Sequence, residues 1–353
     1  MSLSRLRKEI DSIDKKITRM LNLRAKVIVR VGRLKQKNGA SAYSPDRERQ
    51  VLEKVASSSK GPLSKEALES IYREIMSSSF SLEKPLRIVY MGPQASFSHL
   101  AALKKFGSQV EYAACDSIGD VFLEVERGGA DYGVVPIENS IEGAVSHTLD
   151  MFMDSDLKIC SQIMLDVSHN LLANCPKVAV KRVYSNPQVF GQCRIWLQEN
   201  LGRVELVEVS STSRAAQIAH KEKNSACIAS ILAASIYKLK VIARDIEDSP
   251  HNITRFLVIG RASVRPTRRD KTSILFSIKD SVGALHDMLV PFKKYGINLT
   301  KIESRPSKKK AWDYYFFMDL EGHQESLKVK KALKELESKC KFLKVLGSYP
   351  VGE

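Results

Sequence analysis

Thr254 and Arg255 place a hydroxyl beside a guanidinium within the segment Asn252–Phe256. An apolar run from Phe256 to Ile259 follows and is typical of a buried strand. At the edge of such a strand, the arginine can bind an anion while the threonine transfers a proton. A motif of five residues is weak evidence alone, so other segments of the chain must indicate the same chemistry.

Two cations lie on the apolar stripe of a helix predicted near the N-terminus. Arg24 and Lys35 are eleven residues apart, and eleven steps of about 100° return to within about 20° of the starting direction. Basic side chains are rarely buried without an anionic partner. Either these two extend from the rim of a helical bundle into water, or they form a cationic pocket for a dicarboxylate. Arg7, Arg47 and Glu48 are further candidates for this pocket.

Polar residues follow several apolar strands in the middle of the chain, where open α/β sheets bind ligands. Glu138, Asn139 and Ser140 follow one such strand. Ser185 and Gln188, with Gln192, mark another polar strand end, and Ser230 follows a short strand in the same way. Thr212 and Ser213 precede a helix, where they either contact a ligand or form an ordinary N-cap. The loop Gly92–His99, with Ser98 opening a helix, either presents backbone N–H groups to an anion or is an ordinary capped turn.

Three helices are predicted in the first part of the chain, because apolar residues recur at three- and four-residue steps. They span residues 4–38, about 46–55 and about 64–82, with Asn38-Gly39 ending the first and Ser64 capping the third. The first helix is roughly 50 Å long and cannot bury its stripe within a small domain. Dimerisation through this helix is therefore expected.

From Leu86 to about Gly260, strands and helices alternate, which predicts an α/β layered domain. Its first elements are expected at 86–91, after Ser98, at 109–113, from 118 and at 132–136. The polar, basic segment Arg261–Asp270 indicates a linker. Beyond it, elements at 272–278, 283–295, 298–303, 312–320, 324–338 and 342–346 give the order βαββαβ, a ferredoxin-like unit. The predicted domains are 1–84, 85–265 and 271–353.

Composition is that of a globular protein with two or three domains: 353 residues, 43% apolar and 27% charged. The sequence shows neither an apolar run of about 18 residues nor a secretion signal, which predicts a cytoplasmic protein that does not span a membrane. The six cysteines form no C-x-x-C pair, so reduced thiols are expected, with no metal site and no cofactor. The net charge of +16 arises from residues 1–84 (+9) and 266–353 (+7).

The segment Leu6–Asp14, with Arg24, Val31-Gly32, Lys35 and Asp46–Arg49, resembles the helical AroQ-type chorismate mutase family. The resemblance implies a cationic site for dianionic chorismate, which rearranges to prephenate in one pericyclic step. It implies that Arg7 comes from the partner subunit, and that one chain supplies Arg24, Lys35, Arg47, Glu48, Ser79 and Glu83. Arg24, Lys35 and Glu83 are the expected catalytic residues. Glu83 departs from the glutamine of many bacterial relatives, and its carboxylate repels the ether oxygen of the substrate unless protonated.

The motifs G-P-x-x-(S/T)-F-S-H, V-P-I-E-N-S, Y-S-x-P-Q and N-x-T-R-F occur in order over residues 86–262 and resemble prephenate dehydratase. The fold of that family is two α/β lobes with the site between them, like a periplasmic binding protein. The resemblance implies that Thr254 protonates the leaving hydroxyl of prephenate and that Arg255 anchors a carboxylate. The residues expected to line the cleft are Glu138, Asn139, Ser140, Ser185, Gln188, Gln192, Thr212 and Ser213.

Gly283-Ala284-Leu285 and Glu303–Pro306 resemble the G-A-L and E-S-R-P motifs of the ACT domain attached to prephenate dehydratases. Such domains pair across subunits and hold phenylalanine at the interface, so a feedback sensor is expected. The residues expected to bind phenylalanine are Gly283, Ala284, Leu285, Asn298, Leu299, Glu303, Ser304 and Arg305.

The sequence thus predicts a bifunctional enzyme that converts chorismate to prephenate and prephenate to phenylpyruvate, inhibited by phenylalanine. We expect a homodimer or higher homo-oligomer. A nucleic-acid partner is disfavoured, because the basic charge falls where dianionic substrates bind and on the sensor. Two alternatives stay open: a dehydratase domain that prefers arogenate, the aminated relative of prephenate, and a ligand-binding regulator without catalysis. The intact Thr254, Arg255, Arg24 and Lys35 argue against the second.

Overall fold

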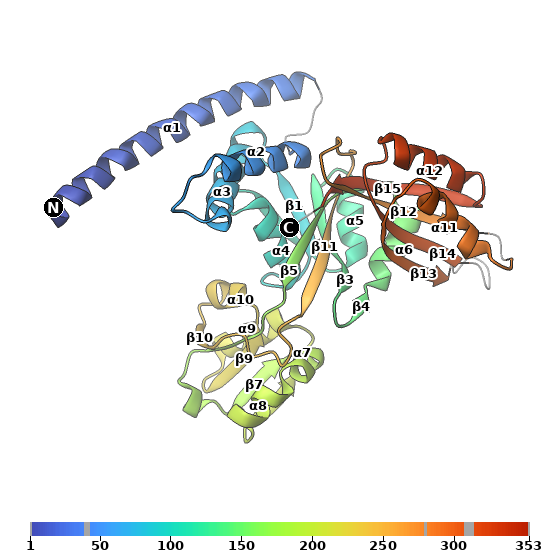
Figure 1. The fold of residues 1–353 in the computed structure, drawn as a ribbon. Coiled ribbons are helices and arrows are strands. Elements are labelled where there is room, and N and C mark those ends of the chain that lie inside the picture. Colours follow the sequence, from blue (N-terminus) through green and yellow to red (C-terminus); the bar gives the residue numbers. More distant parts are fainter. Residues whose placement is uncertain (1, 39–42, 279–280, 307–313, 352–353) are drawn as a thin grey trace. The chain divides into compact units, whose positions relative to one another are not determined.

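The computed structural model describes residues 2–38, 43–278, 281–306 and 314–351. The chain forms two compact units (Figure 1). Unit 1 comprises residues 1–87 and 105–111, and unit 2 comprises residues 88–104 and 112–353. Two predicted boundaries, the helix end at Gly39 and the strand start at Trp312, lie outside the described residues. None of the helices in the described ranges is long and apolar enough to cross a membrane.

Unit 1 is built mainly from three helices, which confirms the helical prediction for this part of the chain. They are α1 (Leu3–Lys37), α2 (Pro45–Ser58) and α3 (Lys65–Glu83). The hydroxyls of Ser2 and Ser64 cap α1 and α3 by accepting hydrogen bonds from backbone N–H groups three residues on. Pro45 takes the first position of α2, where its missing N–H costs nothing.

Helix α1 approaches α3 closely at Gly32, because a Cβ added there would lie 3.1 Å from the Cα of Glu83. Its apolar stripe is otherwise left in solvent within the single chain. Ile10, Ile17 and Val27 are 55%, 51% and 54% exposed. Exposed apolar rows of this kind are typical of a surface that another chain covers.

A small aromatic cluster forms the interior of unit 1. The ring of Tyr43 lies 5.7 Å from that of Phe80 on α3 and 5.0 Å from that of Phe106. Tyr43 is 2% exposed and Phe106 is 1% exposed. Phe106 is the last residue of α4 (Phe97–Phe106), so this unit includes the end of that helix.

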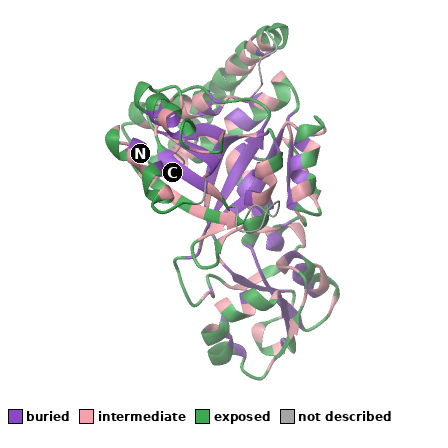
Figure 2. Ribbon diagram, turned by 90° about the vertical axis from the view of Figure 1, so that its right-hand side faces the viewer, coloured by how far each residue is buried: buried purple, intermediate pink, exposed green. Residues whose placement is uncertain are grey.

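The first sheet of unit 2 has the strand order β2-β1-β3-β11-β5, with β4 paired to β3. Its strands are β1 (Arg87–Met91), β2 (Glu111–Cys115), β3 (Tyr132–Asn139), β4 (Gly143–Ala144), β5 (Lys158–Asp166) and β11 (Ile253–Gly260). Helix α5 (Ile118–Glu126) connects β2 to β3, and helix α6 (Ser146–Asp154) connects β4 to β5. The central strands β3 and β11 are almost wholly buried (Figure 2).

Three predicted boundaries in this region are corrected by the structure. The second strand begins at Glu111 rather than Gln109, and the third extends to Asn139 rather than ending at Pro136. Helix α4 begins at Phe97, and the hydroxyl of Ser96, not Ser98, accepts the capping hydrogen bond from the N–H of His99. Apolar patterning marks the middle of an element better than its ends, where side-chain caps decide.

A second sheet of unit 2 has the strand order β10-β6-β9-β7-β8. Its strands are β6 (Asn170–Ala173), β7 (Arg182–Ser185), β8 (Glu205–Glu208), β9 (Ser225–Ala229) and β10 (Lys240–Ala243). Its helices are η1 (Lys177–Ala179), α7 (Pro187–Gln192), α8 (Arg194–Leu201), α9 (Thr212–Lys221) and α10 (Ile231–Ile236). The chain passes between the two sheets at 167–169 and 244–252, which gives the predicted two lobes.

The C-terminal part of unit 2 has the predicted βαββαβ order. Its elements are β12 (Asp270–Ser277), α11 (Ala284–Lys294), β13 (Leu299–Pro306), β14 (Tyr314–Glu321), α12 (Leu327–Glu337) and β15 (Phe342–Pro350). They form an antiparallel sheet of order β13-β14-β12-β15. Strand β12 begins at Asp270, which the sequence had placed in the linker.

The two faces of this four-stranded sheet pack against different partners. On one face, Phe276 and Met318 join a core with Met288 and Phe292 of α11. On the other, Leu275, Phe317 and Tyr349 belong to the same core as residues of the first sheet. Gly347 of β15 permits this approach, since a Cβ there would lie 2.3 Å from the carbonyl oxygen of Ile159 on β5.

Candidate active sites and effector site

Four of the predicted mutase residues form one cluster between α1 and α3. The Arg24 Nη1 donates to the Ser79 Oγ at 2.5 Å, and the Lys35 Nζ lies 3.0 Å from the Glu83 Oε2. Burial lowers the pKa of Arg24, and the charge of Arg47 acts in the same direction. The structure therefore brings three cations, Arg24, Lys35 and Arg47, to one region of unit 1.

Arg7 lies apart from this cluster along α1, and the carboxylate of Glu48 contacts other residues. Arg7 stands 17 residues before Arg24 on α1, which separates them by about 25 Å along the helix. The single chain therefore does not bring Arg7 to this cluster. Glu48 is 7% exposed, and its Oε2 accepts from the Tyr43 hydroxyl at 2.8 Å and pairs with the Lys105 Nζ at 2.7 Å. Lys105 belongs to none of the motifs, so its contact with Glu48 was not predicted.

In unit 2, Thr254 and Asn139 meet across neighbouring strands. They are direct partners in the antiparallel pairing of β11 with β3, and the Asn139 Nδ2 donates to the Thr254 Oγ1 at 2.8 Å. Ser140 holds the same strand ends together, because its hydroxyl donates to the His251 carbonyl at 2.8 Å and accepts from the Ile253 N–H at 2.9 Å. The ends of β3 and β11 are thus fixed against each other.

The orientation of the Asn139 amide decides which way the hydrogen bond to Thr254 runs. The Asn139 Oδ1 accepts from the backbone N–H groups of Ile141 at 2.9 Å and Glu142 at 3.0 Å. A backbone N–H can only donate, so the opposite atom of the amide must be the NH₂ group. That group donates to Thr254, whose own hydroxyl proton is left free for another acceptor.

A second group of side chains extends this network, and sequence reasoning assigned a role to only one of them. The Asn252 Oδ1 accepts from Asn139 at 2.7 Å, and the Asn252 Nδ2 donates to the Gln192 Oε1 at 3.2 Å. The Gln192 Oε1 also lies 2.8 Å from the His169 Nε2, while its Nε2 donates to Glu142 at 3.3 Å. Asn252 is the first residue of the N-x-T-R-F motif, so the motif could have indicated its role. His169 belongs to no motif, and nothing in the sequence indicated it.

His169 is 1% exposed, and burial lowers its pKa. Since Gln192 offers an acceptor oxygen, the neutral imidazole carries its proton on Nε2. The Nδ1 is buried without a hydrogen-bond partner among the described residues. His169 also lies in the 167–169 crossover, where its carbonyl accepts from the Ile246 N–H at 2.9 Å.

The predicted residues of the second lobe occupy different environments. The buried Ser185 hydroxyl donates to the Ile228 carbonyl at 3.0 Å, which is a structural contact. Ser213 is 1% exposed, and its hydroxyl has no hydrogen-bond partner among the described residues. Thr212 opens α9 and Gln188 is exposed on α7. Of these, Ser213 has the polar atom that most needs a ligand or water.

The loop Gly92–His99 behaves as a capped turn. The N–H of Gly92 donates to the Cys115 carbonyl at 2.7 Å, and the N–H of Ala95 donates to the His99 Nδ1 at 3.2 Å. Ala95 has a φ of 69°, in the left-handed region. The N–H groups of Gly92 and Ala95 are therefore already hydrogen-bonded, which favours the capped turn for this part of the loop.

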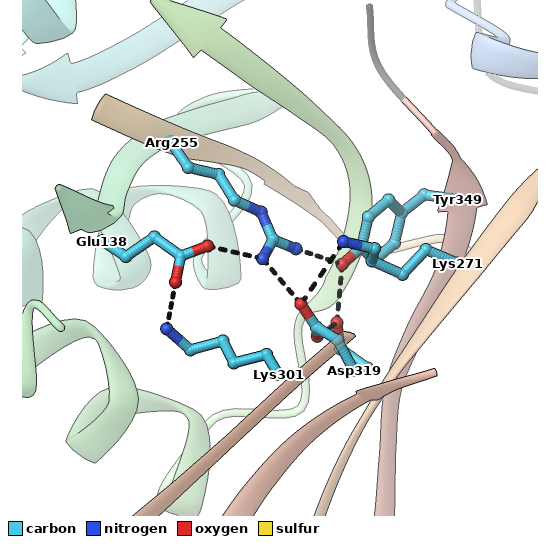
Figure 3. A network of polar contacts seen from close by, with 7 residues as sticks. Glu138, Arg255, Lys271, Lys301, Asp319 and Tyr349 are labelled. Carbon is cyan, nitrogen blue, oxygen red and sulfur yellow. Dashed lines mark hydrogen bonds and ion pairs between the residues drawn. The ribbon is translucent and has the colours of Figure 1, made fainter. Parts of the chain in front are cut away.

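Arg255 faces away from Thr254. Adjacent residues of a strand point to opposite faces of its sheet, and Arg255 contacts the four-stranded sheet (Figure 3). Its Nη1 lies 2.8 Å from the Glu138 Oε1 and 2.6 Å from the Asp319 Oδ2, and its Nη2 donates to the Tyr349 hydroxyl at 2.9 Å. Arg255 is 4% exposed and Asp319 is 0% exposed. The predicted role of Arg255 as a substrate anchor is thus not favoured by its contacts.

Two lysines complete this polar network. Lys301 of β13 pairs with the Glu138 Oε2, and Lys271 of β12 lies 3.9 Å from Asp319. Burial opposes the charge on Glu138, but hydrogen bonds from Lys301 and Arg255 outweigh it and lower the pKa of Glu138. Burial likewise opposes the charge on Arg255, yet Tyr349, Asp319 and Glu138 raise its pKa. Both groups are charged near neutral pH.

The predicted effector residues divide between α11 and the two faces of β13. Gly283 precedes α11 with a φ of 75°, a left-handed conformation that favours glycine. Glu303 and Ser304 are adjacent on β13 and pair with Phe317 and Phe316, which belong to different cores. Ser304 therefore lies on the face that carries the helices, and Glu303 and Arg305 lie on the other. Asn298 is exposed, and Leu299 begins β13.

Fold and sites together define a class of protein: an enzyme with a helical domain holding a cationic cluster, a two-lobed α/β domain and a ferredoxin-like domain. Comparison with protein families gives three matches along the chain. Residues 6–84 match Chorismate mutase type II, residues 88–264 match Prephenate dehydratase, and residues 272–338 match the ACT domain.

Full-length relatives agree with these matches. The chain is 52% identical over 353 residues to the Bifunctional chorismate mutase/prephenate dehydratase of Aquifex aeolicus, covering 99% of this chain and 98% of that protein. It is 44% identical to the protein of the same name from Pseudomonas aeruginosa, covering 99% and 97%. The crystal structure of prephenate dehydratase from Arthrobacter aurescens in complex with L-Phe is 31% identical, with a TM-score of 0.70, and covers 75% of this chain and 90% of that one. The chain belongs to the family of bifunctional chorismate mutase/prephenate dehydratases.

Proposed function

We propose that Thr254 and Asn139 carry the dehydratase step, and that Arg24, Lys35 and Glu83 carry the mutase step, of an enzyme converting chorismate through prephenate to phenylpyruvate. The observation that carries the dehydratase assignment is the fixed orientation of the Asn139 amide. It donates to the Thr254 Oγ1 and so leaves the threonine proton available.

In the dehydratase step, the bond between the ring and its carboxylate breaks and carbon dioxide leaves. The electron pair of that bond completes the aromatic ring, and the ring hydroxyl departs as water after taking a proton from Thr254. A threonine hydroxyl is a weak acid, so its polarisation by the Asn139 amide supports proton transfer in the transition state. Water then restores the proton to Thr254, and aromatisation supplies the driving force.

In the mutase step, the protein binds both carboxylates of chorismate and holds the conformer that rearranges. No nucleophile is needed, so orientation and fixed charges supply the rate enhancement. The Lys35 ammonium stabilises the negative charge that develops on the ether oxygen. Without substrate this ammonium pairs with Glu83 at 3.0 Å, so Lys35 can bind that oxygen only when the Glu83 carboxylate moves away or is protonated. Protonated Glu83 can then donate a hydrogen bond to the same oxygen.

We further propose that two chains pair through α1, which places Arg7 of one chain at the Arg24 cluster of the other. The exposed apolar stripe of α1 and the length of helix between Arg7 and Arg24 support this arrangement. Phenylalanine is the proposed effector of the ACT domain, at Gly283–Leu285 and β13. It favours a less active state of the dehydratase domain.

The first experiment incubates the purified chain with chorismate, with and without phenylalanine, and follows chorismate, prephenate and phenylpyruvate together. Phenylpyruvate formation that phenylalanine suppresses is the expected result. Accumulation of prephenate would contradict the dehydratase assignment, and unchanged chorismate would contradict the mutase assignment. Parallel turnover of prephenate and arogenate separates the two dehydratase substrates.

Mixing two inactive variants tests the shared mutase site. Arg7→Ala and Lys35→Ala each remove a residue that the proposal places in the site, but in different chains of one site. Random re-pairing after mild denaturation should restore about a quarter of the wild-type mutase activity, because half the dimers then contain one intact site of two. If no activity returns while mixed dimers form, Arg7 does not come from a partner.

A further inference from the structure

Strand β13 connects two regions of unit 2 through its two faces. Lys301 and Arg305 are four residues apart and therefore lie on the same face. Lys301 pairs with Glu138 of β3, and the Arg305 Nη2 lies 3.2 Å from the Asp150 Oδ1 of α6. Ser304, a predicted effector residue, is exposed on the opposite face, the one that carries the helices. A shift of β13 at its helix-side face must therefore move both ion pairs.

One of these ion pairs, Lys301–Glu138, ends one residue away from the proposed catalytic groups. Glu138 precedes Asn139 on β3, and Arg255 follows Thr254 on β11. In the paired strands, Glu138 is opposite Arg255 and Asn139 is opposite Thr254. One face of this strand pair carries the Asn139–Thr254 hydrogen bond, and the other carries the Glu138–Arg255 ion pair. A displacement of Glu138 therefore moves Asn139, the next residue of the same strand.

Burial makes these contacts strong enough to transmit a signal. The side chain of Lys301 is 11% exposed, and the side chains of Arg305 and Asp150 are 24% and 15% exposed. Partly buried ion pairs are screened much less than surface pairs. Arg255 is additionally held by Asp319 of β14 and Tyr349 of β15, so three strands of the four-stranded sheet contact the Glu138–Arg255 pair.

We propose that Lys301 is a positioning residue that couples the ACT domain to the dehydratase site, acting on Asn139 and Thr254 through Glu138 and Arg255. The proposal rests on the proposed function, in which phenylalanine binds the ACT domain and lowers dehydratase activity. The structure shows the state with Lys301–Glu138 and Arg305–Asp150 paired. Phenylalanine favours a second state in which β13 has shifted and these pairs have rearranged, because an effector acts only through contacts that differ between states.

Lys301→Met in the full-length chain tests this coupling, since methionine keeps the length of the apolar stem and removes the ammonium. The measured quantity is the ratio of dehydratase rates without and with saturating phenylalanine. Mutase activity in the same sample shows that the protein is intact. Phenylalanine binding is measured separately by equilibrium dialysis. Lys294→Met is the matched control, because Lys294 pairs with Glu335 on the helix surface of the same domain.

The expected result is a ratio within about twofold of unity for Lys301→Met, while bound phenylalanine and the ratio of Lys294→Met stay as in the wild type. Asp150→Asn, which weakens the second pair from the dehydratase side, should lower the ratio in the same direction. A wild-type ratio in Lys301→Met overturns the proposal, as does loss of phenylalanine binding, which would place Lys301 in the effector site itself. A wild-type chain that phenylalanine does not inhibit overturns this proposal and the proposed function together, whereas the preceding outcomes overturn this proposal alone.

Discussion

Asn139→Asp is the sharpest test of the proposed dehydratase mechanism. The aspartate has nearly the same shape and still accepts from the N–H groups of Ile141 and Glu142. Its second oxygen, however, can no longer donate to the Thr254 Oγ1 across the 2.8 Å contact. The hydrogen bond must reverse, so the Thr254 hydroxyl donates to the carboxylate and its proton is withheld from the substrate.

The size of the effect follows from the step that is lost. Proton transfer by a positioned side chain contributes typically about 10²- to 10⁴-fold to the rate, or about 3–5 kcal/mol of the barrier. We therefore expect kcat of the dehydratase to fall by about 10²- to 10⁴-fold. Protonation of the introduced carboxyl restores a donor, so activity relative to wild type should rise below about pH 4, near the ordinary pKa of aspartate.

Phenylpyruvate formation from prephenate is the assay, with chorismate consumption by the same sample as the internal control, because Asn139 lies in unit 2 and the mutase cluster in unit 1. Thr254→Ser keeps the hydroxyl and should retain activity within about tenfold, whereas Thr254→Val should lose as much as Asn139→Asp. An Asn139→Asp variant within tenfold of wild type at neutral pH would refute the assigned direction of the hydrogen bond.

Asp319→Asn leaves the guanidinium of Arg255, 4% exposed, with one carboxylate partner instead of two. We expect the free energy of unfolding to fall by about 2–4 kcal/mol, which lowers the urea midpoint by about 1 M. Tryptophan fluorescence measures this midpoint, and an unchanged midpoint would contradict the expectation. Burial lowers the pKa of His169 in the folded protein below its ordinary value of 6.5. The neutral, buried imidazole therefore contributes fully to the free energy of unfolding above pH 6.5. That contribution is lost as the pH falls toward the lower pKa of the folded state. The melting temperature of wild type should therefore fall more between about pH 7.5 and 5.5 than that of His169→Gln, and equal falls would argue against it. Glu83→Gln removes the carboxylate paired with Lys35 and should raise mutase kcat at neutral pH by about tenfold or more; a lower kcat would show that the carboxylate itself is needed.

Local sequence signals determined much of the architecture. The apolar periodicity of residues 4–38 predicts α1, Ser64 predicts the cap of α3, and the strand and helix order after residue 271 predicts the βαββαβ sheet. These features depend on residues within a few positions of one another, and so they can be derived from the sequence. Element ends shifted where a side-chain hydrogen bond decided them, as with Ser96 at α4.

The sequence motifs likewise predicted that Thr254, Asn139, Arg24 and Lys35 take part in the chemistry. What they did not determine was the direction in which adjacent side chains act. Thr254 and Arg255 form one motif in the sequence, yet strand alternation sends the first to Asn139 and the second to Asp319 and Tyr349.

Partners distant in sequence were decided by the tertiary structure alone. Lys301 reaches Glu138 across 163 positions, and Asn139 reaches Thr254 across 115. Such contacts depend on how whole sheets pack, as where Gly347 lets β15 lie against β5. A single sequence specifies which residues can react or carry charge, but the packing of the sheets selects which of them meet and toward which face each one points.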